Sequence, residues 1–345
     1  MKTDEIYMQR CLDLAAKGLV DAMPNPSVGA VVVHKDTIIG EGFTSAYGGS
    51  HAEVNAIHSV LDKSLLSKST LYVSLEPCNH FGKTPPCSDL IVNSKIPKVV
   101  IGCVDPFSEV AGKGIEKLKA NGIDVTVGVL ENECASSHKR FFTFHTKKRP
   151  FIILKWAESQ DGFVSPNTKL EQKPVWLTNV YSRQLVHKLR SEEMAILVGT
   201  QTVLADNPTL NTRDWFGKNS IRLYIDRENK ISDDVHLKDG TIPTICLTSN
   251  FKENKLNLDF ELVDFTKNVP EQICEILYKR NIQSVIVEGG TFTLQQFINA
   301  NLWDEAMVFK SQVLLNDGTK APMFNKNPFE IKSISNDQLF LFKNK

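Results

Sequence analysis

The feature that most constrains the fold is an alternation of short apolar runs with amphipathic stretches, which occurs in two sets along the chain. The first set has strand-like runs at 29–34, 70–75, 99–104 and 125–129, with helical stretches at 4–19 and near 114–120. The second has strand-like runs at 151–155, 195–199, 221–225, 244–248, 284–287 and 307–310, with helical stretches at 180–190 and 270–280. Strands that alternate with helices predict an α/β domain, so we expect two of them.

Residues 139–150 separate the two sets. This segment is aromatic and basic and ends at Pro150, which indicates a connector packed onto one domain. We place the boundary between residues 146 and 147, which gives domains of 1–146 and 147–345. A chain of 345 residues is long enough for two domains that each bury a core.

Composition narrows the class of protein. Lys plus Arg and Asp plus Glu number 40 each, so the chain carries no overall basic field for nucleic acid or an anionic membrane surface. No apolar run follows Met1–Arg10, so we expect neither a signal peptide nor a membrane helix. The seven cysteines are scattered, which favours a reducing cytoplasm over a disulfide framework.

In the first domain, His51, Cys78 and Cys87 form a set of zinc ligands. One imidazole and two thiolates leave the fourth tetrahedral position to water, as in catalytic zinc sites. Zinc lowers the pKa of bound water to about 7, which provides a hydroxide at neutral pH. Glu53 lies within reach of that water and can carry its proton. H-x-E followed by P-C and a later Cys is the signature of zinc deaminases, in which the Glu is not a ligand.

The local sequence predicts where these side chains lie. Ser50 to Glu53 reads S-x-x-E before an apolar run, which predicts a capping box with Ser50 as the N-cap residue of a helix. Residues 70–75 alternate like a strand that leads into Pro77-Cys78. Cys87 precedes a predicted helix over 88–92, whose N-terminal end favours a thiolate. All three ligands therefore fall at the ends of elements.

Other interpretations of these residues remain open at this level. Glu53 could serve only as the second half of a capping box, and a lone Cys is usually a small buried hydrophobe. The gap between Cys78 and Cys87 also fits a structural zinc knuckle, for which His80 is near enough to compete as a ligand. A nucleoside, deoxycytidylate or tRNA-adenosine deaminase would share the zinc core, although the balanced charge disfavours a tRNA substrate.

The second domain carries weaker motifs. Residues 285–291 run from a strand through Gly289 and Gly290 into an amphipathic helix, a turn that lets backbone N–H groups approach a phosphate but equally fits an ordinary tight turn. Residues 198–208 form a second strand end rich in small polar residues, which fits a pocket rim or a capped loop. Arg190 and Arg213 could pair with a substrate phosphate, since a guanidinium matches its geometry.

Taken together, these motifs resemble the bifunctional riboflavin-biosynthesis proteins that join a diaminohydroxyphosphoribosylaminopyrimidine deaminase to a 5-amino-6-(5-phosphoribosylamino)uracil reductase. The resemblance covers nearly the whole chain. It rests on residues 24–29, 51–53, 76–87, 105–106 and 110–114 in the first domain, and on 155–162, 176–178, 190, 202–208, 213 and 288–290 in the second. The long gap between the two cysteines is typical of this family.

The resemblance implies a fold and a set of site residues. The N-terminal part would be a cytidine-deaminase-like three-layer α/β/α domain, and the C-terminal part a dihydrofolate-reductase-like α/β domain. Glu53 would be catalytic, one Zn²⁺ per chain would be held by His51, Cys78 and Cys87, and the pyrimidine nucleotide would contact Asn25, His80 and Lys83. NADPH would contact Ala157, Trp176, Thr202, Asp206, Gly290, Thr291, Phe292, Thr293, Leu294, Gln295 and Gln296. The ribosyl phosphate substrate of the reductase would contact Arg190, Leu210, Arg213 and Glu288.

The activity implied by the resemblance is zinc-dependent deamination of a pyrimidine ribonucleotide, followed by NADPH-dependent reduction of its ribosyl chain. The partners would be this small molecule, no nucleic acid and no membrane, in a cytoplasmic homo-oligomer. This chain departs from the family in having Pro174 where a Ser usually stands two residues before Trp176. Residues 167–173 are longer than usual, and Gln160 replaces an apolar residue before Asp161-Gly162.

Overall fold

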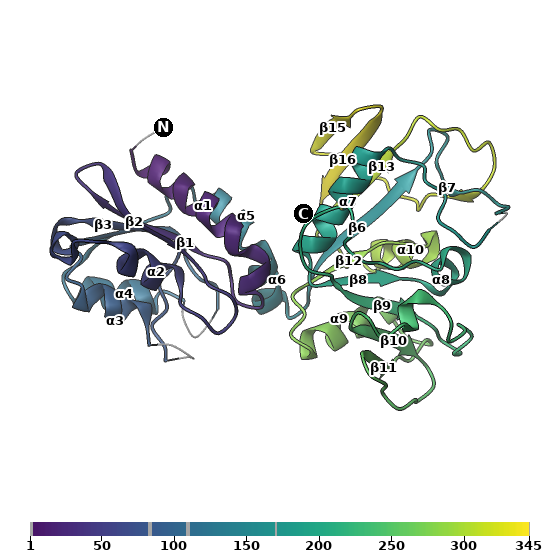
Figure 1. The fold of residues 1–345 in the computed structure, drawn as a ribbon, viewed down its shortest axis with the longest axis horizontal. Coiled ribbons are helices and arrows are strands. Elements are labelled where there is room, and N and C mark those ends of the chain that lie inside the picture. Colours follow the sequence, from purple (N-terminus) through teal and green to yellow (C-terminus); the bar gives the residue numbers. More distant parts are fainter. Residues whose placement is uncertain (1–2, 82–84, 108–110, 170, 345) are drawn as a thin grey trace. The chain divides into compact units, whose positions relative to one another are not determined.

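A computed structural model describes residues 3–81, 85–107, 111–169 and 171–344 of the chain. The chain divides into two compact units, Met1–Lys148 and Arg149–Lys345. Each unit has a sheet of its own, which confirms the prediction of two α/β folds (Figure 1). Within the described residues, none of the helices combines the length and the apolar character that crossing a bilayer requires.

The N-terminal unit is built on a five-stranded sheet with the order β2-β1-β3-β4-β5. Its strands are β1 (Gly29–His34), β2 (Thr37–Phe43), β3 (Thr70–Leu75), β4 (Lys98–Cys103) and β5 (Asp124–Val127). Its helices are α1 (Thr3–Ala22), α2 (Ala52–Ser59), the 3-10 helix η1 (Lys63–Lys68), α3 (Cys87–Asn93), α4 (Lys113–Ala120), α5 (Glu131–Ser137) and α6 (Lys139–Lys147). Strand β1 is antiparallel to β2 and β3, whereas β3, β4 and β5 are parallel.

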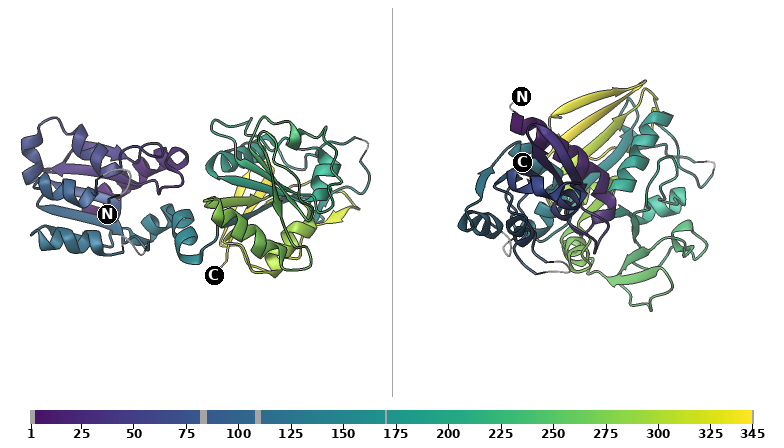
Figure 2. Two further views of the ribbon diagram at one scale, coloured as in Figure 1. Left: turned by 90° about the horizontal axis from the view of Figure 1, so that it is seen from below. Right: turned by 60° about the vertical axis from the view of Figure 1, so that its left-hand side comes forward.

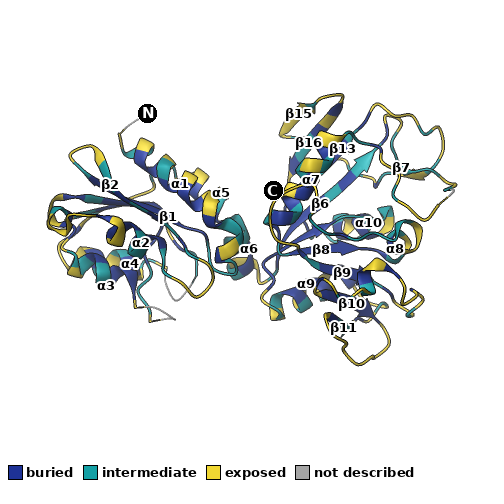
Figure 3. Ribbon diagram, in the orientation of Figure 1, coloured by how far each residue is buried: buried dark blue, intermediate teal, exposed yellow. Residues whose placement is uncertain are grey.

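Helices cover both faces of this sheet. Helices α1 and α5 contact one face, and α2, α3 and α4 lie side by side on the other (Figures 1 and 2). The central strands β1, β3 and β4 are buried almost throughout, as expected for strands covered on both sides (Figure 3). Gly42 of β2 lets α2 approach closely, since a Cβ there would lie 2.4 Å from the Ala56 nitrogen. The N-terminal end of α2 is thereby fixed beside the sheet.

One local prediction for this unit is wrong, and a second segment has a more regular structure than its sequence indicated. The N-cap residue of α2 is His51 rather than Ser50, and it makes no side-chain capping bond, so the predicted capping box does not form. Residues 139–147, part of the segment expected to connect the domains while packed onto one of them, form helix α6 of the N-terminal unit, in which Thr143 and Phe144 are buried. The aromatic side chains that suggested a packed connector give this helix its apolar face.

The C-terminal unit is built on a nine-stranded sheet with the order β11-β10-β9-β8-β12-β6-β13-β16-β15. Its strands are β6 (Phe151–Glu158), β8 (Ala195–Val198), β9 (Ile221–Ile225), β10 (Thr244–Thr248), β11 (Leu258–Leu262), β12 (Ser284–Val287), β13 (Glu305–Lys310), β15 (Glu330–Ile334) and β16 (Asp337–Lys343), and β7 (Phe163–Ser165) pairs with β14 (Thr319–Lys320). Its helices are α7 (Val180–Glu192), α8 (Thr200–Asp206), the 3-10 helix η2 (His236–Lys238), α9 (Val269–Lys279) and α10 (Thr291–Asn299).

Seven neighbouring strands of this sheet, from β11 to β13, are parallel, and β16 and β15 extend it in antiparallel fashion. One apolar cluster, with α9 and α10, covers one face, and residues of α7 and α8 join two further clusters on the sheet. The neighbouring strands β8 and β12 end side by side and lead directly into α8 and α10. Sites in open α/β sheets lie at such carboxyl ends of strands.

Candidate active sites

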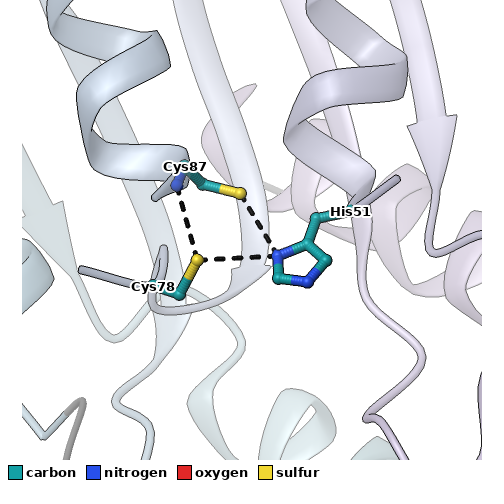
Figure 4. Close-up of side chains that lie close together, drawn as sticks. All are labelled: His51, Cys78 and Cys87. Carbon is teal, nitrogen blue, oxygen red and sulfur yellow. Dashed lines mark hydrogen bonds between the residues drawn. The ribbon is translucent and has the colours of Figure 1, made fainter. Parts of the chain in front are cut away.

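The structure brings His51, Cys78 and Cys87 together in the N-terminal unit (Figure 4). His51 is the N-cap residue of α2, Cys78 follows the end of β3, and Cys87 is the first residue of α3. The Nδ1 atom of His51 lies 3.5 Å from the Cys78 Sγ and 3.3 Å from the Cys87 Sγ. The backbone N–H of Cys87 also donates to the Cys78 Sγ at 3.4 Å.

This geometry fits zinc. Tetrahedral bonds of about 2.3 Å to sulfur and about 2.0 Å to nitrogen place a sulfur and a nitrogen ligand about 3.5 Å apart. All three ligand atoms lie within 4.8 Å of one another, and Cys87 is fully buried. Within the described residues no fourth His, Cys, Asp or Glu joins this group. An open fourth position is the arrangement of a catalytic zinc rather than a structural one.

Glu53 lies in the first turn of α2, beside His51, and is buried. Its carboxyl group shares a hydrogen bond with the Cys87 thiol. Burial raises the pKa of Glu53 to about 7, so the group can both take up and release a proton near neutral pH. A hydrogen bond from Cys87 lowers the pKa of Cys78, which favours the thiolate that a metal requires.

A second buried carboxylate, Glu76, fixes the strand end that carries Cys78. One oxygen of Glu76 accepts the N–H groups of Gly114 and Ile115 at 2.9 and 3.2 Å, and the other accepts those of Gly112 and Asp105 at 3.0 and 3.3 Å. Gly114 is needed at this contact, because a Cβ there would lie 2.0 Å from the carbonyl oxygen of Pro77. The role of Glu76 cannot be predicted from the sequence, because its partners are backbone groups about 30 to 40 residues away.

The residues predicted to bind the pyrimidine nucleotide are only partly described. Asn25 lies just after α1 and donates its N–H to the Ala22 carbonyl at 2.9 Å. His80 lies two residues after Cys78, and its Nδ1 is buried without a hydrogen-bond partner among the described residues. Asp105 is buried nearby, and burial raises its pKa to about 6. Lys83 lies outside the described residues.

In the C-terminal unit, a buried ion cluster lies at the end of β12. Glu288 pairs with Arg190 of α7 and, at 3.3 Å, with Lys155 of β6. Burial opposes the ionisation of Glu288, but the two cations outweigh it and hold its pKa at about 2. Burial lowers the pKa of Lys155, and Glu288 acts against this shift. Lys155 belongs to the motifs that suggested the family, but sequence analysis assigned it no contact.

The glycine turn after Glu288 fits a phosphate group. Gly289 and Gly290 adopt φ values of 146° and 69°, which other residues rarely reach. Gly290 is the N-cap residue of α10, and no side chain caps this helix, so its first N–H groups face outward without a side-chain acceptor. The hydroxyl of Thr202 lies 3.0 Å from where a Cβ of Gly289 would be. A turn of this kind could accept a phosphate group, because backbone N–H groups at the N-terminal end of a helix bind anions.

The other predicted NADPH residues differ in their exposure. Phe292 is mostly exposed, whereas Thr293 and Leu294 are buried. The side chains of Thr291 and Gln295 already contact the 320–323 segment, through the Lys320 carbonyl and the Met323 N–H. Asp206, at the end of α8, is paired with Lys169, and Ala157 lies half-buried in β6.

The remaining predicted contacts lie near α7. Trp176 is about half exposed, and the Arg213 guanidinium lies 5.8 Å from its ring centre. Leu210 is buried in an apolar cluster and has a φ of 49°. The structure adds two residues that sequence analysis missed, Arg183 over the Trp176 ring and His187 under Arg213. Helical spacing with Arg190 was the only available signal for them.

Two family models match the chain. Residues 150–336 match the RibD C-terminal domain, and residues 1–103 match the cytidine and deoxycytidylate deaminase zinc-binding region.

Relatives and solved structures match over most of the chain. The riboflavin biosynthesis protein RibD of Aquifex aeolicus is 39% identical over 91% of this chain and 88% of its own length. The RibD of Actinobacillus pleuropneumoniae is 42% identical over 84% of this chain and 78% of its own. The crystal structure of a diaminohydroxyphosphoribosylaminopyrimidine deaminase/5-amino-6-(5-phosphoribosylamino)uracil reductase from Thermotoga maritima is 36% identical, covers 99% of this chain and 98% of its own, and superposes with a TM-score of 0.91.

Proposed function

The chain belongs to the family of the riboflavin biosynthesis protein RibD, which joins a deaminase to a reductase, and from this premise we propose which residues carry each reaction. Residues 1–146 hydrolyse the ring amine of 2,5-diamino-6-ribosylamino-4(3H)-pyrimidinone 5′-phosphate. Residues 147–345 then reduce the ribosyl chain of the product to ribityl with NADPH. The observation that supports this most strongly is the convergence of His51, Cys78 and Cys87 beside the buried Glu53.

For deamination, His51, Cys78 and Cys87 hold Zn²⁺. When bound, the ion supplies a nucleophile by lowering the pKa of a water to about 7. Glu53 would take one proton from the attacking water and pass it to a ring nitrogen, then take the second proton from the new hydroxyl group and pass it to the amine, which leaves as ammonia. Asn25, His80 and Lys83 position the pyrimidine nucleotide.

For reduction, the turn at Gly289-Gly290 and the first turn of α10 hold the cofactor phosphates, with Thr202 beside them. NADPH supplies the hydride when bound, so positioning and charge are the contributions of the protein. Glu288 stays ionised, because its pKa is about 2. It therefore fixes Lys155 and Arg190 next to the sugar rather than acting as a proton donor.

One assay tests both assignments. Purified protein is given the diaminopyrimidine nucleotide with and without NADPH, and with and without a zinc chelator. We expect the protein to release ammonia in the absence of NADPH and to oxidise NADPH once it is added. The chelator should abolish the release of ammonia. Release of ammonia from cytidine or tRNA but not from this nucleotide would refute the assignment.

We further propose that the protein is a cytoplasmic homo-oligomer without nucleic-acid or membrane partners. None of the seven cysteines forms a disulfide, which supports a reducing compartment. Light scattering coupled to gel filtration measures the oligomeric state, and a monomeric mass at micromolar concentration would contradict the proposal.

A further inference from the structure

Cys78 and Cys87 are nine positions apart in the sequence, which is a long separation for two ligands of one metal ion. In the C-x-x-C pairs of many zinc sites, the short connection itself keeps the two sulfur atoms close together. A longer connection does not fix the distance between its ends, because the entropic cost of bringing them together has to be offset by other contacts. Contacts across the base of the 78–87 loop must therefore keep the two sulfur atoms at ligand distance.

Among the described residues, three hydrogen bonds cross the base of this loop. The backbone N–H of Cys87 donates to the Cys78 Sγ at 3.4 Å, and that of Ser88 donates to the Cys78 carbonyl at 3.1 Å. The third bond joins two side chains, since the Ser88 hydroxyl donates to the Asn79 Oδ1 at 2.9 Å. Asn79 and Ser88 each directly follow a ligand, so this bond links the chain immediately behind both sulfur atoms.

Asn79 also connects the loop to helix α4. Its Nδ2 donates to the carbonyl of Lys113, the first residue of α4, at 3.3 Å. The next residue of the helix, Gly114, donates its N–H to Glu76 at 2.9 Å. The start of α4 therefore holds the chain two residues before Cys78 and again one residue after it. The ligand lies between two contacts to the same helix.

The bond between Asn79 and Ser88 is the one of the three that depends on side chains. Ser88 is fully buried, so its hydroxyl group cannot exchange this partner for bulk water. The other two bonds are donated by backbone N–H groups, which a substitution of the side chain leaves in place. The contribution of the Asn79–Ser88 bond can therefore be separated from that of its neighbours.

We propose that Asn79 and Ser88 are positioning residues of the metal centre, which hold the sulfur atoms of Cys78 and Cys87 at the separation that a tetrahedral Zn²⁺ requires. Hydrogen-bonded groups behind the ligands of a metal fix the orientation of those ligands, and their loss weakens metal binding. Neither residue coordinates the ion. The inference rests on the proposed zinc-dependent deaminase activity, and it adds that retention of the metal depends on two uncharged side chains.

The rate of zinc loss tests this role independently of catalysis. Zinc-loaded full-length protein is mixed with an excess of a chromogenic chelator, and the transfer of zinc is followed over time. We expect Ser88→Ala and Asn79→Ala each to lose zinc about tenfold faster than the wild type. The double variant should be no faster than Asn79→Ala alone, because that substitution already removes the bond to Ser88.

Replacement of zinc by Co²⁺ separates positioning from a general loss of stability. The visible absorption of Co²⁺ is strong in a tetrahedral site and weak in an octahedral one, so it should be weaker in Ser88→Ala. Ser69→Ala is the matched control, because Ser69 is also buried and its hydroxyl donates to the Leu65 carbonyl at 2.8 Å, at the opposite end of β3 from Cys78. Hydrogen exchange of the metal-free proteins should show similar losses of protection in both variants. The rate of zinc loss and the Co²⁺ spectrum should change only in Ser88→Ala.

The proposal would be overturned by zinc loss at the wild-type rate in Ser88→Ala, or by an equal acceleration in Ser69→Ala. It would also be overturned if the effects of the two single variants multiplied in the double variant, because the side chains would then act separately. In each of these cases the wild type still binds zinc and releases ammonia, so the proposed function is unaffected. If the wild type bound neither Zn²⁺ nor Co²⁺, the proposed function would fail together with this inference.

Discussion

The two units assemble their sites in opposite ways. In the N-terminal unit, His51, Cys78 and Cys87 lie together beside the buried Glu53, and these donor groups suit a bound metal ion. In the C-terminal unit, Glu288 is already neutralised by Lys155 and Arg190, and the turn beside it is left open for a ligand. The first site therefore depends on a bound ion, whereas the second depends on charges within the chain. Removing the Glu53 carboxylate should therefore affect mainly catalysis, whereas removing the Glu288 carboxylate should affect mainly the free energy of unfolding.

The largest effect should follow removal of the carboxylate at Glu53. In Glu53→Gln the zinc ligands remain, but proton transfer is lost, so ammonia release should fall by about 10²–10⁴-fold. Metal analysis should still find one zinc per chain, and NADPH oxidation with the deaminated nucleotide should be unchanged. Glu116→Gln, on the exposed side of α4, is the control for loss of a carboxylate in this unit. If Glu53→Gln still released ammonia at the wild-type rate, Glu53 would have only a structural role.

The matching change in the C-terminal unit should act on folding. Glu288→Gln leaves Lys155 and Arg190 buried without their carboxylate, which should cost about 3–5 kcal/mol of unfolding free energy. All four tryptophans, at 156, 176, 215 and 303, lie in this unit, so indole fluorescence during urea unfolding measures it alone. Glu228→Gln removes an exposed pair with Lys230 and should leave stability nearly unchanged. If the two variants had equal free energies of unfolding, the buried ion cluster would not stabilise the C-terminal unit as proposed.

Much of the fold could be predicted from the sequence because its central strands are buried on both faces. The runs at 29–34, 70–75 and 244–248 coincide with β1, β3 and β10. Strand β15 gave no such signal, since four of its five residues are exposed. The start of α2 was misplaced because the S-x-x-E pattern describes local capping, whereas His51 is directed at two thiol groups 27 and 36 residues away.

The sites were predictable to different degrees for the same reason. The metal ligands have distinctive residue types in a compact motif, so sequence alone identifies them. The partners of Glu288 have no such motif, because an Arg 98 residues away could equally be a solvated side chain. Arg183 and His187 are likewise ordinary helix residues until packing places them against Trp176 and Arg213.

A smaller effect should follow Gly114→Ala, which tests how the metal centre is held. The new Cβ would lie 2.0 Å from the Pro77 carbonyl oxygen, so the backbone next to Cys78 must shift, at a cost of about 1–3 kcal/mol. We expect faster zinc loss to a chelator and weaker ammonia release, with reductase activity intact. Gly122→Asn is the control, because a Cβ there meets nothing and Asn tolerates its φ of 78°. Zinc loss at the wild-type rate in Gly114→Ala would show that the contact does not support the site.

The smallest effect concerns acid, to which one buried histidine in each unit should contribute in the same direction, whereas in the N-terminal unit the raised pKa values of Glu53 and Asp105 act in the opposite direction. The N-terminal unit contains the buried His138 and the C-terminal unit the buried His187. Burial lowers the pKa of each histidine to about 4. At His187, Arg190 and Arg213 lower the pKa further, whereas Asp214 opposes this shift. The unfolded chain takes up a proton on each histidine near pH 6.5, whereas the folded chain does not. The contribution of each neutral histidine to the free energy of unfolding is therefore complete above pH 6.5 and is lost as the pH falls toward 4. The loss is about 1 kcal/mol per histidine between pH 6 and pH 5. His187→Gln should flatten the pH dependence measured by indole fluorescence, and His138→Gln should flatten only that of hydrogen exchange in β1 and β3. If either variant flattened the pH dependence of both units, the two units would not unfold independently. The stabilities of the metal-dependent and the charge-dependent unit could then not be compared separately.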